Sequence, residues 1–326
     1  MILALTTVIV LAGAGFLAYR MLAEPDAPDR FLPESTVATV PVGRAPSAIA
    51  VHRTANKVYV ANYTSESVTV IDGATNSVTS TVDLPGFRPS ELEIDSTRDR
   101  LYIGSTAGRK IKILNTTTDE IIDTVTVGDG PFIAADQGRD TLHTANNRDL
   151  DVTSYNAATG EVRHSDPIGT RPYSISFDPK RAVLYVVITA DKESAVAVVD
   201  SQTLTVVDRI PLGTASFESA YDPISNNLFV ANTNDDTVTL VDMNTRTIRR
   251  TIPLGTTAYE FGLDPYRGTA FVGDFNTGTV FALDARTGDT VRTYRPGTKA
   301  TAVAVDTDRK VLYVADQDSQ VVHVMR

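Results

Sequence analysis

The sequence predicts an all-β fold, a seven-bladed β-propeller of four-stranded blades, closed by an N-terminal strand that completes the last blade. Three observations predict it. A short aromatic and β-branched motif returns seven times, a glycine keeps the same interval, and each unit contains four short runs rich in Val, Ile, Thr and Tyr. Four strands in a period of 40–45 residues are typical of propeller blades.

The repeat is clearest in its second strand, which reads Val58-Tyr59-Val60-Ala61-Asn62 in the first copy. Its aromatic position is occupied in turn by Tyr59, Tyr102, His143, Tyr185, Phe229, Phe271 and Tyr313, with steps of 43, 41, 42, 44, 42 and 42 residues. A helical repeat of similar length would need a 3.6-residue periodicity and fewer β-branched runs. The seven copies therefore indicate seven blades.

Two further columns follow the same interval. The first contains Gly43, Gly86, Gly128, Gly169, Gly213, Gly255 and Gly297, and a proline follows three residues later in the first four copies. The second is Asp or Asn with Thr three residues on, as in Asp72 and Thr75. Because Asp and Asn side chains bond to nearby backbone and favour turns, these pairs predict hairpins.

Strand boundaries and ring closure follow from the same alignment. In the first copy the strands are predicted at 47–51, 57–61, 67–71 and 77–82, whereas the last copy ends after a third strand at 320–325. The missing fourth strand is available at 36–40, before the first glycine of the repeat. We therefore expect a propeller domain over residues 35–326 whose closure removes exposed sheet edges.

The N-terminus is apolar. Residues 2–19 contain no charged side chain and are followed by Arg20, and about 20 apolar residues span a bilayer. Residues 1–20 are therefore either a signal peptide or a transmembrane anchor, and both interpretations stay open. Residues 21–34, with two prolines among charges, predict an extended linker. Both interpretations place the propeller outside the cytoplasm, in the periplasm or at the cell surface, secreted or attached to the membrane.

Composition excludes several kinds of chemistry. The chain contains no cysteine, which excludes disulfides, iron–sulfur clusters, c-type haem attachment and thiol catalysis. No nucleotide-binding fingerprint is present, since Gly128-Asp129-Gly130 lacks the third glycine. The net charge of −10 argues against nucleic acid as a partner. His143 takes the aromatic position of its copy and is predicted to be structural, and the four histidines do not share a column that could form a metal site.

At this point the chain resembles a known family. The Tyr-Val-Ala-Asn core with its proline, aspartate and threonine columns is similar to YVTN-type β-propeller repeat proteins, over roughly residues 37–326. The resemblance implies an exported bacterial or archaeal propeller. Relatives of this kind include surface-layer domains, a periplasmic single-stranded DNA-binding propeller, and propeller lactonases and lyases. No residue set of an enzyme relative matches here, so the resemblance implies no catalytic residue.

A ligand site is expected at the axial mouth, where the inner strands begin. One column there contains Ser47, Ser90, Phe132, Tyr173, Phe217, Tyr259 and Thr301, which forms an arc of four aromatics. The next column contains Ala48, Glu91, Ile133, Ser174, Glu218, Glu260 and Ala302. Three carboxylates are unexpected in an inner strand, and Glu218 and Glu260 lie in adjacent blades. Crowded carboxylates raise one another's pKa or recruit a cation.

A third column follows the second strand of each blade and is expected to join this mouth. Its polar members are Asn62, Ser105, Asn146, Asn232, Asp274 and Asp316. The combined site would take a cation, a polyol or a positively charged group, with a divalent cation at Glu218 and Glu260 as one option. The alternative is that these polar side chains only face water in the channel.

The function most consistent with these residues is an extracytoplasmic binding or interaction protein, with an envelope protein or a small ligand at the mouth. A metal-assisted enzyme of lactonase or lyase type, using the mouth carboxylates, is the alternative. Single-stranded nucleic-acid binding through the aromatic arc is a second alternative, against which the charge argues.

Overall fold

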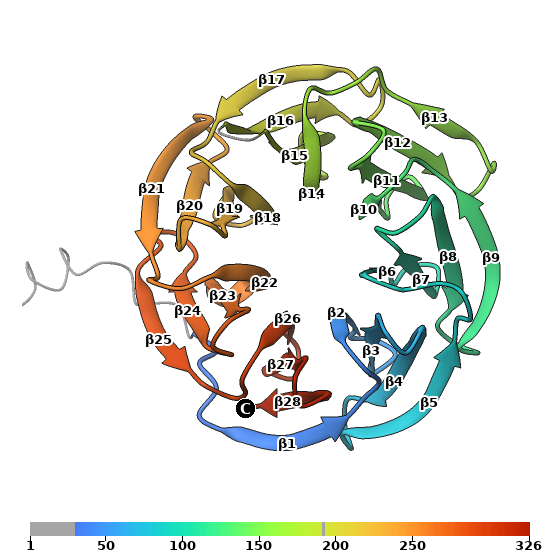
Figure 1. The fold of residues 1–326 in the computed structure, drawn as a ribbon, viewed down its shortest axis with the longest axis vertical. Coiled ribbons are helices and arrows are strands. Elements are labelled where there is room, and N and C mark those ends of the chain that lie inside the picture. The colour runs from blue at the N-terminus through green and yellow to red at the C-terminus, as the bar shows by residue number, and fades with distance from the viewer. Residues whose placement is uncertain (1–29, 191–192) are drawn as a thin grey trace, which may run out of the picture. The chain divides into compact units, whose positions relative to one another are not determined.

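The computed structural model describes residues 30–190 and 193–326 and shows a seven-bladed β-propeller. Seven sheets of four antiparallel strands surround a central channel (Figure 1). No helix within this part of the chain is long and apolar enough to cross a membrane. The predicted signal or anchor segment, 1–20, and residues 21–29 of the linker lie outside the described residues.

The innermost strands are β2 (Pro46–His52), β6 (Glu91–Asp95), β10 (Pro131–Asp136), β14 (Arg171–Asp178), β18 (Ser216–Asp222), β22 (Ala258–Asp264) and β26 (Ala300–Asp306). The second strands are β3 (Lys57–Asn62), β7 (Arg100–Gly104), β11 (Thr141–Asn146), β15 (Val183–Thr189), β19 (Asn227–Asn232), β23 (Thr269–Asp274) and β27 (Val311–Asp316). The third strands are β4 (Ser67–Asp72), β8 (Lys110–Asn115), β12 (Asp151–Asn156), β16 (Ser194–Asp200), β20 (Thr237–Asp242), β24 (Val280–Asp284) and β28 (Val321–Met325). The outermost strands are β5 (Ser77–Asp83), β9 (Glu120–Thr126), β13 (Val162–His164), β17 (Val206–Pro211), β21 (Thr247–Pro253), β25 (Thr290–Tyr294) and β1 (Thr36–Pro41). A 3-10 helix, η1 (Pro265–Arg267), connects β22 to β23.

Blades are numbered 1 to 7 from β2 to β26, and the predicted closure is confirmed. Strand β1 pairs antiparallel with β28, so that the last blade has the order β1-β28-β27-β26. Val40 of β1 is buried in the same apolar cluster as Val322 and Val324 of β28. The ring is therefore closed by backbone hydrogen bonds and apolar packing between the two ends of the propeller.

The compact unit begins slightly before the predicted boundary. It spans Phe31–Arg326, and the ring of Phe31 is buried with its centroid 6.0 Å from that of Phe271. The backbone N–H groups of Glu34 and Ser35 donate hydrogen bonds of 2.6 and 3.1 Å to the carbonyl of Arg326. Residues 31–34 of the expected linker thus pack on the propeller.

The core lies between neighbouring blades. The aromatic column of the repeat is almost fully buried, with Tyr59, Tyr185, Phe229 and Phe271 at 0 to 1% exposure. Burying each such side chain stabilises the fold by about 1.5–3 kcal/mol. The outermost strands are mostly exposed, as in β21. The buried contacts between blades stabilise the propeller without disulfides, which this cysteine-free chain cannot form.

The predicted hairpin turns are confirmed as well. At the end of β4, the Asp72 carboxylate accepts hydrogen bonds from the backbone N–H groups of Ala74 and Thr75, at 2.9 and 2.7 Å. The Asp or Asn of this column therefore fixes the turn that leads to the outermost strand.

Candidate ligand-binding site

The inner strands begin at one end of the channel, and irregular pairing there turns consecutive side chains toward it. On β18, the register with β19 shifts between Ser216 and Ser219, which leaves one extra residue around Phe217 and Glu218. On β22 the same shift surrounds Tyr259 and Glu260. Strand residues normally alternate between the two faces, but a β-bulge redirects side chains. An aromatic ring and the carboxyl group that follows it can therefore both face the channel.

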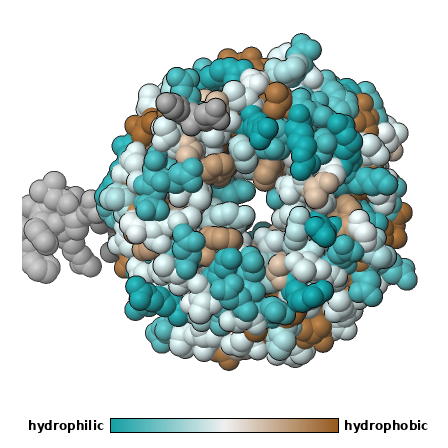
Figure 2. Space-filling view, in the orientation of Figure 1, coloured by the Kyte–Doolittle hydropathy of each residue, from teal (hydrophilic) through white to brown (hydrophobic). Residues whose placement is uncertain are grey.

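These residues line one cavity of about 480 Å³. It contains all three glutamates of the predicted column, Glu91, Glu218 and Glu260, and all four aromatics of the predicted arc, Phe132, Tyr173, Phe217 and Tyr259. Among the described residues that line this mouth cavity, none is Lys, Arg or His. The space-filling view along the channel shows an open centre within a largely hydrophilic face (Figure 2).

The three glutamates are half-buried in the channel wall, and their carboxyl groups influence one another. Burial raises the pKa of Glu91 and of Glu218 well above the usual range, and the charge of Glu260 raises both further. Burial also raises the pKa of Glu260 to about 8. A positive charge in the cavity would favour the ionised forms. Binding of a cation in this cavity would therefore be accompanied by release of protons from these carboxyl groups.

The aromatic arc is continuous over three blades. The rings of Phe132 and Tyr173 lie 6.4 Å apart between centroids, and Phe217 meets Tyr173 edge-on at 4.8 Å. Tyr259 instead packs against Phe275 at 5.1 Å, and the Lys299 ammonium lies 4.2 Å from the centroid of the Phe275 ring. Tyr259 thus lines the cavity from the inner strand of blade 6, and its recorded ring contact is with Phe275 and not with the other three rings.

The third predicted column does not reach the mouth, and this expectation needs correction. Its polar residues are buried inside the blades, namely Asn62, Ser105, Asn146, Asn232, Asp274 and Asp316. Their side chains form hydrogen bonds within the blade. The Asn62 amide nitrogen donates to Ser67 and Thr69, although its Oδ1 has no hydrogen-bond partner in the described structure, and the Asp316 carboxylate accepts from Thr298 and Ser319.

The physical reason is the direction of the side chains. Asn62 lies opposite Pro46 at the mouth end of the sheet, as the hairpin argument requires, but its side chain turns back toward the loop that contains Gly43. A Cβ atom on Gly43 would lie 2.7 Å from the Asn62 Cγ, and one on Gly128 would lie 2.2 Å from the Asn146 Cγ. At these positions the glycine column is the packing partner of the asparagine column.

The residues that follow this column reach the cavity instead. Thr106 comes after β7, and Thr233 and Asn234 come after β19. These three residues were not predicted to belong to the site, because they lie in loops outside the repeat alignment. Their one signal is a position one or two residues past the buried polar column.

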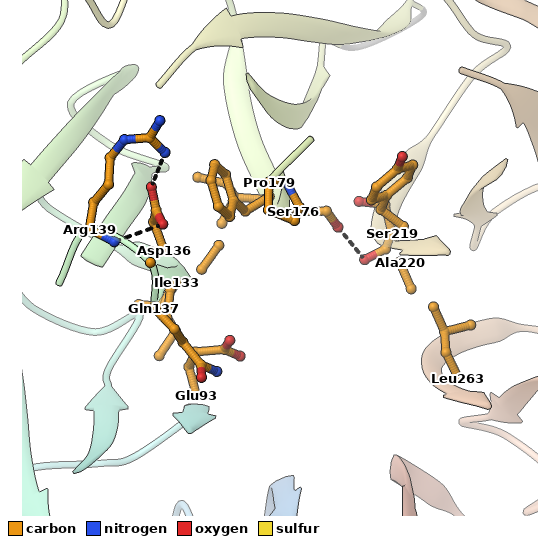
Figure 3. Close-up of a pocket in the computed structure, with 16 residues that line it drawn as sticks. Glu93, Ile133, Asp136, Gln137, Arg139, Ser176, Pro179, Ser219, Ala220 and Leu263 are labelled. Carbon is orange, nitrogen blue, oxygen red and sulfur yellow. Dashed lines mark hydrogen bonds and ion pairs between the residues drawn. The ribbon is translucent and has the colours of Figure 1, made fainter. Parts of the chain in front are cut away.

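A second cavity, of about 590 Å³, lies toward the other ends of the inner strands (Figure 3). Glu93 lines it, two residues beyond Glu91 on β6, and burial raises the pKa of Glu93 to about 7. Asp136 and Arg139 form an ion pair of 2.9 Å in its wall. Residues two apart on a strand face the same side, so the position of Glu91 already indicated that Glu93 also faces the channel. Glu93 was not among the predicted site residues.

A preformed metal site is not visible in the part of the chain described here, since no three His, Cys, Asp or Glu side chains are grouped to hold an ion. Glu218 and Glu260 lie on adjacent inner strands, whereas Glu91 lies on β6 across the channel (Figure 1). A divalent cation at Glu218 and Glu260 therefore stays a prediction.

Comparisons with known proteins agree on the fold. No family model matches the chain, and no curated protein matches it. A solved chain titled Kuenenia stuttgartiensis hydrazine synthase aligns with a TM-score of 0.77 at 16% identity, over 93% of this chain and 99% of that one. The Cps50 (Swd1) β-propeller domain of Myceliophteria thermophila aligns with a TM-score of 0.76 at 10% identity, over 90% and 99%.

At such identities the likeness establishes the fold alone. The chain is a seven-bladed β-propeller protein, and this fold hosts many different functions. Its resemblance to YVTN-type repeat proteins stays a prediction from the repeat, because no family model matches.

Proposed function

We propose that this chain is an extracytoplasmic β-propeller that binds a positively charged organic group in the mouth cavity. One observation supports this most strongly: three carboxyl groups and four aromatic rings line a single cavity of about 480 Å³. Carboxylates form charge-assisted hydrogen bonds with ammonium and guanidinium groups, and ring faces attract the same cations. The volume lies within the range of small-molecule sites.

An organic cation fits this arrangement better than a bare metal ion. Calcium and magnesium require several oxygen ligands within about 2.0–2.6 Å. Here Glu91 lies across the channel from Glu218 and Glu260, and the rings of Phe132 and Tyr173 lie on the blades between β6 and β18. A ligand with a positive head and an apolar body could contact Glu218, Glu260 and the ring of Phe217 together.

The location outside the cytoplasm is part of the same proposal. It rests on the apolar segment 2–19 and on the prolines that follow it. An envelope protein that presents a lysine or arginine side chain would offer the same chemistry as a free organic cation. Nucleic acid is not favoured, since phosphates would meet the carboxyl groups.

The test is calorimetric titration of the full-length protein with choline and with its uncharged analogue 3,3-dimethylbutanol. We expect choline to bind and the analogue to bind at least tenfold more weakly, because only the charged head is attracted to the carboxylates and to the ring faces, without any N–H donor. The double variant Glu218→Gln/Glu260→Gln should lose the preference, whereas the exposed control Glu120→Gln should keep it. Equal binding of the two compounds would contradict the proposal.

A metal arm separates the enzymatic alternative. Calcium, magnesium and manganese are tested for a rise in melting temperature, with EDTA as the reversal. A rise that EDTA and the double variant both abolish would replace the organic-cation proposal with a metal-assisted one and direct the search to lactone and lyase substrates. A response to neither class of cation would remove the mouth site.

A further inference from the structure

A third cavity, of about 190 Å³, lies between blades 3 and 4, separate from the mouth. His143 of β11 and Ser154 of β12 contribute to it from blade 3, and Ser201 and Gln202 contribute from the turn after β16 in blade 4. Arg163 of β13 completes the outer side. Arg139 and Asp136, drawn in Figure 3, stand between this seam cavity and the 590 Å³ cavity and line both.

The equivalent seam between blades 1 and 2 holds a carboxylate in this place, which the aligned positions of the other copies (Asn76, Gly160, Leu204, Arg246 and Gly288) do not supply. The Tyr59 hydroxyl donates a hydrogen bond of 2.9 Å to the Asp119 carboxylate. The Lys57 ammonium donates to both oxygens of the same carboxylate, each at 2.9 Å. Asp119 comes four residues after Asn115, in the turn that ends β8. A carboxylate from one blade thus accepts hydrogen bonds from the second strand of the blade before it.

At the seam between blades 3 and 4 this acceptor is missing. Leu204 stands four residues after Asp200, in the position of Asp119, and is buried in an apolar cluster. His143 replaces the tyrosine, and its shorter side chain leaves the space that the hydroxyl would fill. The nearest carboxylate, Asp136, is already bonded to the backbone N–H and the guanidinium of Arg139, at 3.1 and 2.9 Å.

The donors remain without their acceptor. His143 Nδ1 and Ser201 Oγ are buried, in side chains of residues 1% and 3% exposed, and neither atom has a hydrogen-bond partner within the described structure. The Arg163 guanidinium donates to the Gln202 carbonyl at 2.7 Å, and its Nε lies 4.0 Å from a carboxylate oxygen of Glu161. Burial and the charges of Arg163 and Arg139 lower the pKa of His143 to about 4, against the opposing effect of Asp136. The imidazole is therefore neutral and can donate from Nδ1.

We propose that this seam cavity binds a small oxyanion, such as phosphate or sulfate, in the place that Asp119 occupies at the seam between blades 1 and 2. Ser201, His143 and Arg163 supply donors from both blades. The guanidinium groups of Arg139 and Arg163 both line the cavity, each with one carboxylate partner, Asp136 at 2.9 Å and Glu161 at 4.0 Å. A volume of 190 Å³ admits one tetrahedral oxyanion with water. The bound ion would connect blades 3 and 4.

The test is titration of the full-length protein with sodium phosphate, sodium sulfate and glycerol phosphate, at an ionic strength held constant with chloride. We expect saturable one-to-one binding of phosphate and sulfate. Ser201→Ala and Arg163→Gln should each weaken it about tenfold, since hydrogen bonds to a charged group are stronger than neutral ones. Arg246→Gln, an exposed arginine of blade 5, should leave it unchanged.

His143→Tyr is the most specific variant, because it restores the residue of the repeat and fills the cavity. His143→Tyr is expected to abolish binding while the propeller still folds. If His143→Tyr does not fold, the binding result of Ser201→Ala tests the proposal instead. If glycerol phosphate binds, and Ser201→Ala weakens its binding as much as that of phosphate, the natural ligand is a phosphate ester. If glycerol phosphate does not bind, the natural ligand is the free ion. Absence of saturable binding, or equal affinity in the wild type, Ser201→Ala and Arg163→Gln, would show that the cavity holds only water. The mouth residues are not involved, so neither proposal depends on the other.

Discussion

Replacing Glu260 with glutamine removes a carboxyl group that must lose its proton inside the channel as the pH rises. The folded protein raises the pKa of this group from about 4.5 to about 8. Between these values the folded carboxyl keeps a proton that the unfolded one has lost. Because the folded state then binds more protons, the free energy of unfolding falls as the pH rises through this window. Glu260→Gln should lack that fall.

The difference between the two pKa values corresponds to a decrease of at most about 5 kcal/mol in the free energy of unfolding above pH 8. The side chain is only half-buried and faces the channel, so solvent screening reduces this, and we expect about 2 kcal/mol. For a domain of this size, about 2 kcal/mol is a change of roughly 4 °C in melting temperature. The advantage of Glu260→Gln over the wild type should therefore grow by about that amount between pH 5 and pH 9.

Thermal unfolding followed by circular dichroism at pH 5, 7 and 9 measures this difference. Glu120→Gln, on the exposed strand β9, is the matched control and should track the wild type at each pH. The reasoning would be refuted by a difference between Glu260→Gln and wild type that stays constant, or shrinks, as the pH rises. An organic cation added at pH 9 should restore part of the wild-type stability, since it compensates the ionised carboxylate.

Two further predictions concern the aromatic arc and the glycine column. Phe217→Leu should weaken choline binding several-fold and leave 3,3-dimethylbutanol unaffected in calorimetry, because cation–π attraction contributes about 0.5–2 kcal/mol and leucine keeps only the apolar contact. Gly128→Ala should lower the free energy of unfolding by about 1–3 kcal/mol in urea, because its Cβ would lie 2.2 Å from the Asn146 Cγ. Gly213→Ala, from the same column but with no described atom within 4 Å of the added Cβ, should change stability by less than about 1 kcal/mol; equal losses in the two alanine variants would contradict the packing argument.

The fold could be predicted from the sequence because the information is repeated. Seven copies of one strand pattern specify the same four-stranded sheet seven times, and the missing strand of the last copy specifies which segment closes the ring. The pairing of β1 with β28 follows from this count. Only the first residues of the domain were missed, since the burial of Phe31 against Phe271 is a contact outside the repeat.

The mouth was predicted in part. Alignment of the inner strands brought Glu91, Glu218 and Glu260 to one level, and the structure places all three in one cavity. The assignment of Asn62 and its equivalents failed because backbone proximity does not determine side-chain direction. The bulge that lets Tyr259 and Glu260 face the same space is also invisible in the sequence, since the alternation rule predicts opposite faces.

The sequence by itself therefore determined the number of blades, the order of their strands and the level at which the carboxyl groups meet, because these properties depend on periodicity along the chain. Only the tertiary structure decided which polar columns are buried, which donors lack an acceptor and which rings touch. Those outcomes depend on the packing of one blade against the next, where a residue such as Leu204 or His143 meets partners about 40 residues or more away in the chain. Periodicity places such partners at the same seam between blades. Whether a donor there meets an acceptor depends on the individual side chains and their contacts.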